Sequence, residues 1–189
     1  MNAHPVIVTL LTKIMNMMIL FEYVPDGFGV GVMIPIPKAH LGNSNVRCDD
    51  FRGISVNSIV SKLFELCLLS VFSSYLGSSD LQFGFKANSS CSKALYTVRK
   101  TIEFFNERQS TVNLCALDMA KAFDKMNRHA LFIKLLNRKC PMTLINILDC
   151  WFSKTFACVK WGDCMSSFVK LQCGTRQGEI LSPTLFQFY

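Results

Sequence analysis

The chain has 189 residues, of which 50% are apolar and 17% are charged, and this balance excludes intrinsic disorder because so much apolar surface must be buried. Basic residues outnumber acidic ones and give a net charge of +7, which favours a polyanionic partner. The nine cysteines include no Cys-x-x-Cys pair, which argues against a disulfide framework and a cysteine zinc site and favours reduced, buried thiols.

The first apolar stretch, residues 6–24, is interrupted by Lys13, Asn16 and Glu22. No run reaches the roughly 18–20 apolar residues of a membrane span, and residues 1–5 lack the basic residues of a secretory signal. We therefore expect an intracellular protein that begins with an amphipathic core helix. The residues at helical spacing are Leu10, Leu11, Ile14, Met17, Met18 and Phe21.

Two strands and two helices are predicted in the rest of the first half. Residues 30–37 and 51–56 read as strands around a polar loop at 40–50. A helix is expected over 58–76, with an inward stripe of Ile59, Leu63, Leu66 and Leu69. A second helix is expected over 90–108, with Ala94, Leu95, Val98, Ile102 and Phe105 facing inward.

The second half begins with residues 111–117, TVNLCAL, which read as a buried strand. A helix around Leu131 and a helix over 142–151 follow. Two alternating segments, 155–161 and 167–173, are joined through Gly162-Asp163 and predict a hairpin. The last apolar segment is expected to form a helix that begins at Ser182-Pro183, with the serine as its N-cap.

Three segments carry residues suited to chemistry. Asp118 directly follows the predicted strand 111–117, where a carboxylate can offer oxygen ligands to a hard cation; the alternative is a helix N-cap. Arg176 and Gln177 lie between two glycines. They could bind a phosphate or the edge of a base, and the alternative is an ordinary strand-to-helix connection. Lys38 and Arg52 lie on the arms of the first predicted hairpin. They could bind a triphosphate together, and the alternative is two exposed cations without a ligand.

These segments occur in the order of a known family. LDMAKAFDKMNRHALFIKLL resembles motif A, and CGTRQGEILSPTLF resembles motif B, of the reverse transcriptases of non-LTR (LINE-like) retrotransposons. IPIPK, DDFRGISVNSIVSKLFE and LQFGFKANSSCSKAL resemble the motifs of the fingers in sequence order. The resemblance extends from about Leu10 to Tyr189.

The resemblance implies a role for each matching residue of motif A. Asp118 matches the aspartate that binds both catalytic Mg²⁺ ions, and the backbone carbonyl of Met119 matches a further ligand. The ions lower the pKa of the primer 3′-hydroxyl and neutralise the leaving pyrophosphate. Phe123 matches the aromatic gate that excludes a ribose 2′-hydroxyl.

The resemblance also implies nucleotide contacts and partners. Gln177 and Gly178 match residues beside the incoming nucleotide, and Arg52 and Lys38 match triphosphate contacts of the fingers. The implied partners are an RNA template, a DNA primer and a deoxynucleoside triphosphate, with no membrane and no protein partner implied. The remaining cations would follow backbone phosphates.

The implied fold is α+β, a partial right-hand polymerase with fingers over 1–110 and part of the palm over 111–189. Its small antiparallel palm sheet would be backed by helices. The family's Asp-Asp hairpin, motif C, is absent, and one carboxylate rarely holds two hard cations. Glu179 stands where the family commonly has a small residue, beside the triphosphate. We therefore expect this chain alone not to polymerise DNA.

Two other interpretations stay open at this point. One is a non-catalytic nucleic-acid-binding module that keeps the basic residues for the backbone phosphates. The other is an unrelated Mg²⁺-dependent phosphotransferase that uses Asp118 as ligand or nucleophile. The second needs another acidic ligand, and Asp124 is the one near in sequence.

Overall fold

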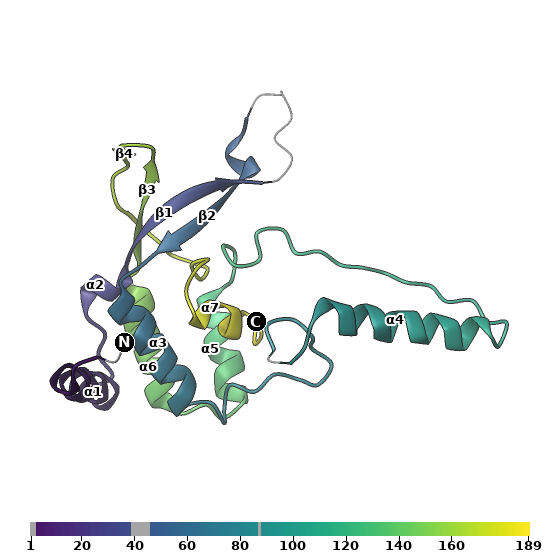
Figure 1. The fold of residues 1–189 in the computed structure, drawn as a ribbon, viewed down its shortest axis with the longest axis horizontal. Coiled ribbons are helices and arrows are strands. Elements are labelled where there is room, and N and C mark those ends of the chain that lie inside the picture. The colour runs from purple at the N-terminus through teal and green to yellow at the C-terminus, as the bar shows by residue number, and fades with distance from the viewer. Residues whose placement is uncertain (1–2, 39–45, 87) are drawn as a thin grey trace. The chain divides into compact units, whose positions relative to one another are not determined.

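The computed structural model describes residues 3–38, 46–86 and 88–189. It is an α+β structure with a small sheet and helices, as expected (Figure 1). The helices are α1 (Pro5–Leu20), α2 (Asp26–Gly29), α3 (Ile59–Val71), α4 (Cys91–Asn106), α5 (Arg128–Asn137), α6 (Met142–Ser153) and α7 (Leu181–Phe186), with a 3-10 turn η1 (Cys48–Asp50). The strands are β1 (Val30–Pro37), β2 (Phe51–Val56), β3 (Phe156–Trp161), β4 (Cys164–Met165) and β5 (Val169–Lys170).

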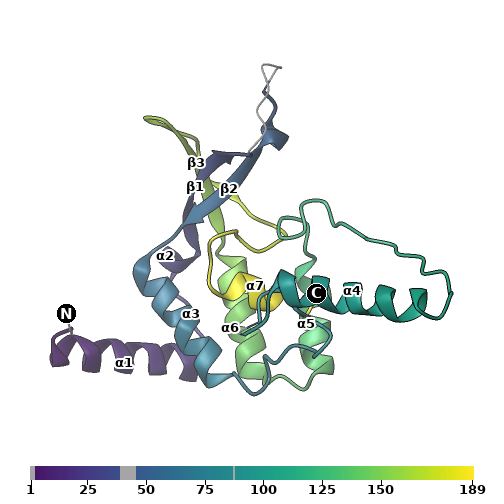
Figure 2. The same cartoon turned by 45° about the vertical axis from the view of Figure 1, so that its right-hand side comes forward.

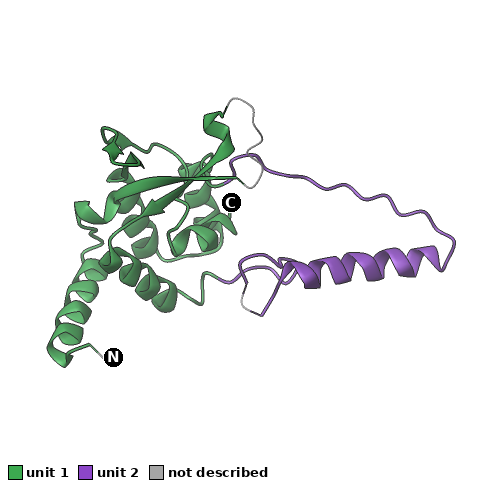
Figure 3. Cartoon of the chain, turned by 45° about the horizontal axis from the view of Figure 1, so that its top comes forward, with its two compact units in different colours: residues 1–76, 123–189 green, residues 77–122 purple. Residues whose placement is uncertain are grey.

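The chain divides into two compact units (Figure 3). The larger unit comprises residues 1–76 and 123–189 and holds the sheet, and the smaller unit comprises residues 77–122 and holds α4. The expected division into fingers (1–110) and partial palm (111–189) stays a prediction.

The sheet of the larger unit has the strand order β2-β1-β3-β4, and β5 also pairs with β3. β1 and β2 form the expected antiparallel hairpin, in which Ile36 lies opposite Arg52. β1 and β3 are parallel, with Gly31 opposite Ala157. The sheet is therefore mixed, not antiparallel as expected, because β3 enters it after helix α6 and not through a tight turn. The predicted loop at 40–50 lies outside the described residues over 40–45.

The second predicted hairpin is present in a shortened form. Lys160 of β3 pairs with Met165 of β4 across the turn at Gly162-Asp163. Gly162 has a φ of +56°, a left-handed conformation that glycine adopts without a steric penalty. β5 then pairs antiparallel with the start of β3, so the chain returns toward the centre of the larger unit.

The hydrophobic core of the larger unit lies mainly between α3, α5, α6 and α7. α3 and α6 lie side by side in both views (Figures 1 and 2), and the rings of Phe64 and Trp151 are 5.8 Å apart between centroids. Phe28 of α2 contacts both rings. Leu131 and Leu135 of α5 are fully buried, whereas Leu136 is exposed.

Helix α1 forms where it was predicted, but most of its expected core stripe is wrong. Within the stripe Met18 is buried, whereas Leu10, Ile14, Met17 and Phe21 are exposed, and Met15, outside the stripe, is buried. Met15 contacts Cys67 of α3 through the two sulfur atoms, 3.5 Å apart. The helix is apolar on more than one side, so spacing alone does not select the contacting side. In the described parts of the chain, no helix combines the length and apolar character that crossing a membrane requires.

Helix α3 also packs on a face next to the predicted one. Ile59 is 84% exposed and Leu66 is 50% exposed, whereas Phe64 and Leu68 are completely buried. The buried face includes two polar residues, Ser61 and Glu65. A hydrophobic pattern cannot select a face that contains a glutamate, and the reason for its burial lies in a distant segment described below.

The predicted strand at 111–117 is wrong. Residues 110–119 have no regular secondary structure, and Leu117 is 92% exposed. A strand needs a neighbour for its backbone N–H and C=O groups, and none of the described strands pairs with this segment. α4, which lies in the smaller unit, buries none of its predicted inward residues.

The cysteines are all free. Cys140 and Cys158 are buried, but five of the nine are exposed, so the expectation of buried thiols is wrong for most of them. The exposed ones are Cys48, Cys91, Cys115, Cys164 and Cys173.

Candidate functional site

Residues 173–186, the segment that resembles motif B, are fixed within the larger unit through Arg176. The side chain of Arg176 is buried and donates hydrogen bonds to the backbone oxygens of Gly29 (2.9 Å) and Phe28 (3.2 Å). It also forms an ion pair with Glu179. A guanidinium has several donors in a fixed plane, so one side chain ties motif B to the start of β1.

Glu179 turns into the protein. Its side chain is 9% exposed and is paired with Arg176. Asn57 Nδ2 donates to Glu179 Oε1 (2.9 Å), and Ser182 Oγ donates to Glu179 Oε2 (3.3 Å). A free carboxylate beside a triphosphate would repel it, but the charge of Glu179 is compensated inside the protein. Ser182 is also not the helix N-cap that was predicted, since α7 begins at Leu181.

Glu65 provides the missing cap at the start of α7. It is 1% exposed, and its Oε2 accepts a hydrogen bond from the N–H of Leu181 (2.7 Å). Its other oxygen, Oε1, has no hydrogen-bond partner among the described residues. Burial and then the nearby Glu179 raise the pKa of Glu65 from 4.5 to about 7. The buried polar face of α3 therefore serves a helix more than 100 residues away in sequence.

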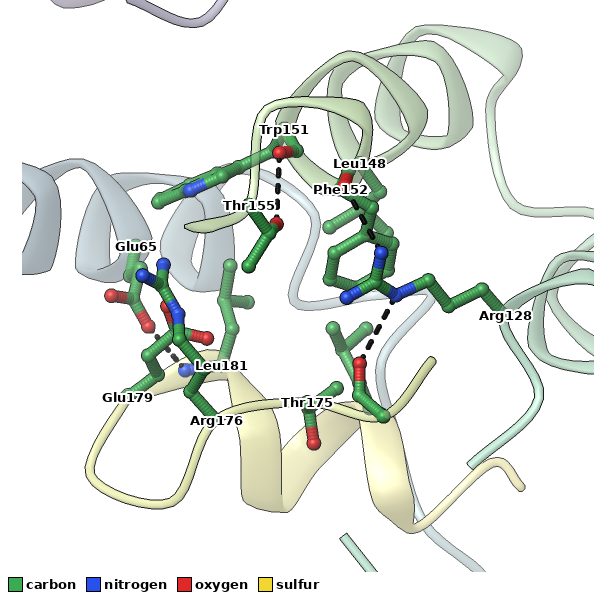
Figure 4. A pocket seen from close by; sticks show the side chains of 12 residues that line it. Glu65, Arg128, Leu148, Trp151, Phe152, Thr155, Thr175, Arg176, Glu179 and Leu181 are labelled. Atoms are coloured by element: carbon green, nitrogen blue, oxygen red, sulfur yellow. Dashed lines mark hydrogen bonds and ion pairs between the residues drawn. The ribbon is translucent and has the colours of Figure 1, made fainter. Parts of the chain in front are cut away.

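Figure 4 shows the small cavity that these residues line, with Glu65, Arg176 and Glu179 on one side and Arg128 on the other. The volume of the cavity is about 20 Å³, which is room for roughly one water molecule. Arg176 Nε and Thr175 Oγ1 also lack a hydrogen-bond partner among the described atoms. The cavity is too small for a nucleotide, so it belongs to the support of motif B.

We expect the raised pKa of Glu65 to appear as a pH-dependent stability. The folded protein retains a proton that the unfolded chain releases between pH 4.5 and about 7, so this stabilising contribution is complete below pH 4.5 and is lost as the pH rises through about 7. Glu65→Gln removes the titration. Between pH 5 and pH 8 the unmodified chain should lose roughly 2.5 kcal/mol of its free energy of unfolding through this residue, and Glu65→Gln should not. Urea denaturation at the two pH values measures the difference.

Glu103→Gln is the matched control. Glu103 is partly exposed, and its hydrogen bond with Lys100 lowers its pKa. It therefore titrates below this pH range, and its loss should leave the difference between pH 5 and pH 8 unchanged. Parallel pH profiles for Glu65→Gln and the unmodified chain would contradict the expectation.

Arg128 is a partly buried cation that sequence reasoning missed. It donates to the backbone oxygens of Gly174 (3.1 Å), Phe152 (3.0 Å) and Leu171 (2.8 Å). Its guanidinium lies 4.7 Å from the ring centroid of Phe152, and burial lowers its pKa. One signal was present in the sequence: a basic residue in the first turn of α5 is unfavourable next to the positive end of the helix dipole, which indicates a tertiary partner.

The structure brings Lys38 and Arg52 to the same end of the β1–β2 hairpin. The N–H of Lys38 donates to the oxygen of Asp50 (2.8 Å), which continues the register that places Ile36 opposite Arg52. Because side chains alternate between the faces of a strand, Lys38 and Arg52 belong to the same face. Both residues are exposed, and Lys38 Nζ donates to the backbone oxygen of Asp49.

Gln177 and Gly178 lie along the outer edge of β2. The N–H of Ser55 donates to the oxygen of Gln177 (2.7 Å). Gly178 has a φ of +107°, and a Cβ at this position would lie 2.6 Å from the oxygen of Ser55 and 3.4 Å from Ile54 Cγ2. Ile54 and Arg52 share a face of the strand, so Gly178 lies at the edge of the surface that carries the two predicted triphosphate contacts.

An open groove lies along the first residues of motif B. Its volume is about 500 Å³, within the range of small-molecule sites. It is lined by Met33, Gly53, Asp124, Val169, Lys170, Leu171, Gln172, Cys173, Thr175, Arg176 and Gln177. The groove therefore connects the hairpin of Arg52 with the segment that carries Gln177.

Phe123 is held against the same segment. Its backbone oxygen accepts a hydrogen bond from the N–H of Thr175 (2.9 Å), and its ring lies 4.8 Å from that of Phe186 in α7. The structure thus places the predicted gate next to the start of motif B, in the larger unit.

Asp118 and Met119 belong to the smaller unit, so they are not placed relative to the other candidate residues. Both are exposed and lie in the irregular segment 110–119. In the described portion of the chain, no group of three or more histidine, cysteine, aspartate or glutamate side chains is arranged to hold a metal ion. The donor set therefore does not fit a pair of Mg²⁺ ions.

The larger unit is therefore an α+β structure in which the hairpin with Lys38 and Arg52 adjoins the segment with Arg176 and Gln177. The two exposed cations of the hairpin make this surface suitable for phosphates. A family model for reverse transcriptase (RNA-dependent DNA polymerase) matches residues 36–189. The match covers well over half of the chain, and the chain belongs to this family.

Three relatives come from mobile elements of fruit flies. The chain is 24% identical to the "Probable RNA-directed DNA polymerase from transposon X-element" of Drosophila melanogaster. It is 25% identical to the "RNA-directed DNA polymerase from mobile element jockey" of Drosophila funebris. It is also 25% identical to the "Retrovirus-related Pol polyprotein from type-2 retrotransposable element R2DM" of Drosophila melanogaster. These matches cover 95–98% of this chain but 17–20% of the relatives, so the chain spans about a fifth of their length.

Proposed function

We propose that this chain forms the nucleotide-binding part of a retrotransposon reverse transcriptase, from the fingers and part of the palm of a right-hand polymerase. The observation that carries the proposal is the Ser55–Gln177 hydrogen bond, which holds motif B against the strand that bears Arg52. This bond joins two family motifs 122 positions apart in one surface. The proposed ligands are an incoming deoxynucleoside triphosphate, an RNA template and a DNA primer.

Within this proposal, Lys38 and Arg52 contact the triphosphate, which suits two exposed cations on one face of a hairpin. Gln177 and Gly178 lie beside the sugar and base. Gly178 has a positive φ and lies close to Ser55, so no side chain occupies this edge of the strand. Phe123 acts as the gate that excludes a ribose 2′-hydroxyl, and its contact with Phe186 fixes its ring.

The family reaction, Mg²⁺-dependent addition of deoxynucleotides to a primer 3′-hydroxyl, needs more ligands than this chain offers. We propose Asp118 and the backbone carbonyl of Met119 as its share of the metal site. One exposed carboxylate rarely binds two hard cations, so the 189-residue chain binds nucleic acid without polymerising. A non-catalytic nucleic-acid-binding module is the second candidate, and the ten basic against five acidic side chains after residue 110 favour it.

Primer extension by the purified chain tests this proposal. We expect no extended product with Mg²⁺, all four deoxynucleotides and an RNA template annealed to a DNA primer. Binding of the labelled template–primer, measured in the same preparation, shows that the protein is folded and competent to bind. Extension that Asp118→Asn abolishes would show that the chain completes its own metal site and would overturn the expected inactivity. Absence of any salt-sensitive binding would overturn the proposed function itself.

A further inference from the structure

The small cavity beneath motif B is lined by three residues that each keep one buried polar atom without a hydrogen-bond partner among the described residues. The atoms are Glu65 Oε1, Thr175 Oγ1 and Arg176 Nε. The three residues are only 1%, 5% and 4% exposed. Buried polar groups that remain unpaired are costly and therefore rare, so this cavity is suited to a ligand that can bond to them.

Two of these atoms belong to side chains whose other polar atoms are already in use. Glu65 accepts the N–H of Leu181 through Oε2, which leaves Oε1. Arg176 donates to Gly29 and Phe28 through its two terminal nitrogens, which leaves Nε. Figure 4 places both side chains on the same side of the cavity. They are close enough for the charge of Arg176 to lower the pKa of Glu65, against the larger effect of burial.

The size and charge of the cavity select water as the ligand. Its volume of about 20 Å³ admits roughly one water molecule. A cation there would lie beside the guanidinium of Arg176, and an anion would lie beside the carboxyl groups of Glu65 and Glu179. A water molecule can accept a hydrogen bond from Nε. It can also serve Oε1 in both protonation states of Glu65, because water donates as well as accepts.

We propose that one ordered water molecule occupies this cavity and bridges Glu65 Oε1 and Arg176 Nε. Glu65 then supports motif B at two points, at Leu181 directly and at Arg176 through the water. The carboxylate of Glu179 also lines the cavity and offers an acceptor, which gives the water the usual number of about three partners. This hydration site concerns the support of motif B, whatever ligand motif B binds.

Water NOE and ROE spectra of the unmodified 189-residue chain test the bridge at the Nε–H of Arg176. We expect a cross-peak between this proton and water that has opposite signs in the two experiments, which marks a water molecule that tumbles with the protein. Arg52 is the reference in the same spectra. Its side chain is exposed, so the water around it exchanges rapidly and gives no cross-peak of this kind.

Glu65→Met and Glu65→Gln separate the bridge from the space that the side chain fills. Methionine is similar in length but cannot bond the water. Oxygen-17 relaxation dispersion should therefore count one long-lived water molecule fewer per chain, and Arg176 should lose its cross-peak. Glutamine keeps an oxygen for Leu181 and offers an N–H to the water, so both signals should remain. The oxygen nucleus reports the water itself, which excludes a cross-peak relayed by the hydroxyl proton of Thr175.

Each other outcome contradicts the bridge. It is overturned if the Nε–H of Arg176 shows no such cross-peak in the unmodified chain, or if this proton exchanges too fast to be seen, because Nε would then be open to solvent. It is also overturned if Glu65→Met retains the cross-peak or leaves the oxygen-17 count unchanged. If Glu65→Met does not fold, the unmodified chain and Glu65→Gln decide, and loss of the long-lived water in Glu65→Gln would overturn the bridge.

Discussion

Replacement of Arg176 by methionine is expected to lower the free energy of unfolding by about 3–5 kcal/mol, because it leaves Glu179 as a buried carboxylate without its counter-charge. The backbone oxygen of Gly29 loses the hydrogen bond from Arg176 at the same time, and that of Phe28 keeps only the one from Trp151 Nε1. The pKa of Glu65, already raised by burial and by Glu179, loses the lowering effect of the neighbouring Arg176. Urea denaturation followed by circular dichroism measures the change.

A double variant separates the charge from the packing in this prediction. Arg176→Met/Glu179→Gln keeps an acceptor for Asn57 and removes the unpaired charge, so it should recover about half of the lost stability relative to Arg176→Met. Arg52→Met is the matched control, because Arg52 is exposed and surface substitutions usually stay within about 0.5 kcal/mol. Equal losses for Arg176→Met and Arg52→Met would show that the ion pair contributes nothing.

The second large effect is expected from Gly174→Ala. Gly174 has a φ of +76°, and a Cβ there would lie 2.5 Å from the oxygen of Asp124 and 2.6 Å from that of Phe123. Both neighbours are backbone atoms, so the alanine would have to separate motif B from segment 123–126. The left-handed conformation and the loss of a buried hydrogen bond there together cost about 3–4 kcal/mol.

Gly162→Ala provides the control for the conformational part. Gly162 has a similar φ of +56°, but no atom lies within 4 Å of its would-be Cβ. This variant should therefore lose only about 1–2 kcal/mol. If the two alanine variants were equally stable by urea denaturation, the close packing of motif B against segment 123–126 would not exist in solution.

Gly174→Ala also has an expected functional result. The N–H of Gly174 donates to Met126 (2.8 Å), and the N–H of Thr175 donates to Phe123 (2.9 Å). Because these two bonds place Phe123 beside motif B, their loss would separate the proposed gate from Gln177. Gly162, on the turn after β3, takes no part in this arrangement.

The local pattern of the sequence predicted most helices and the first hairpin. β1, β2, α4 and α6 form within a few residues of their expected limits, and α5 forms around Leu131 as expected, because their turns and apolar spacing are local signals. The family and the candidate nucleotide contacts also came from the sequence, through motifs in a fixed order. Lys38 and Arg52 then meet on one face because the hairpin register follows from the two strands alone.

The contacts of the buried Glu65 and the partly buried Arg128 could not be predicted in this way. Glu65 and Arg128 looked like ordinary surface residues of helices, since their partners, Leu181 and Gly174, lie far away in the sequence. The strand expected before Asp118 failed for the converse reason. Its apolar residues suited a sheet, but a strand forms only where another strand accepts its hydrogen bonds, and among the described strands none does so.

The sequence by itself determined the family of this protein, the α+β composition and the residues that we propose to contact nucleotide. Only the tertiary structure decided that Glu179 is neutralised inside the protein by Arg176 and that motif B is fixed between β2 and segment 123–126. The physical reason is the range of the interactions. Turns and amphipathic helices depend on residues a few positions apart, whereas the burial of a charge is possible only when distant segments supply its counter-charge and hydrogen bonds.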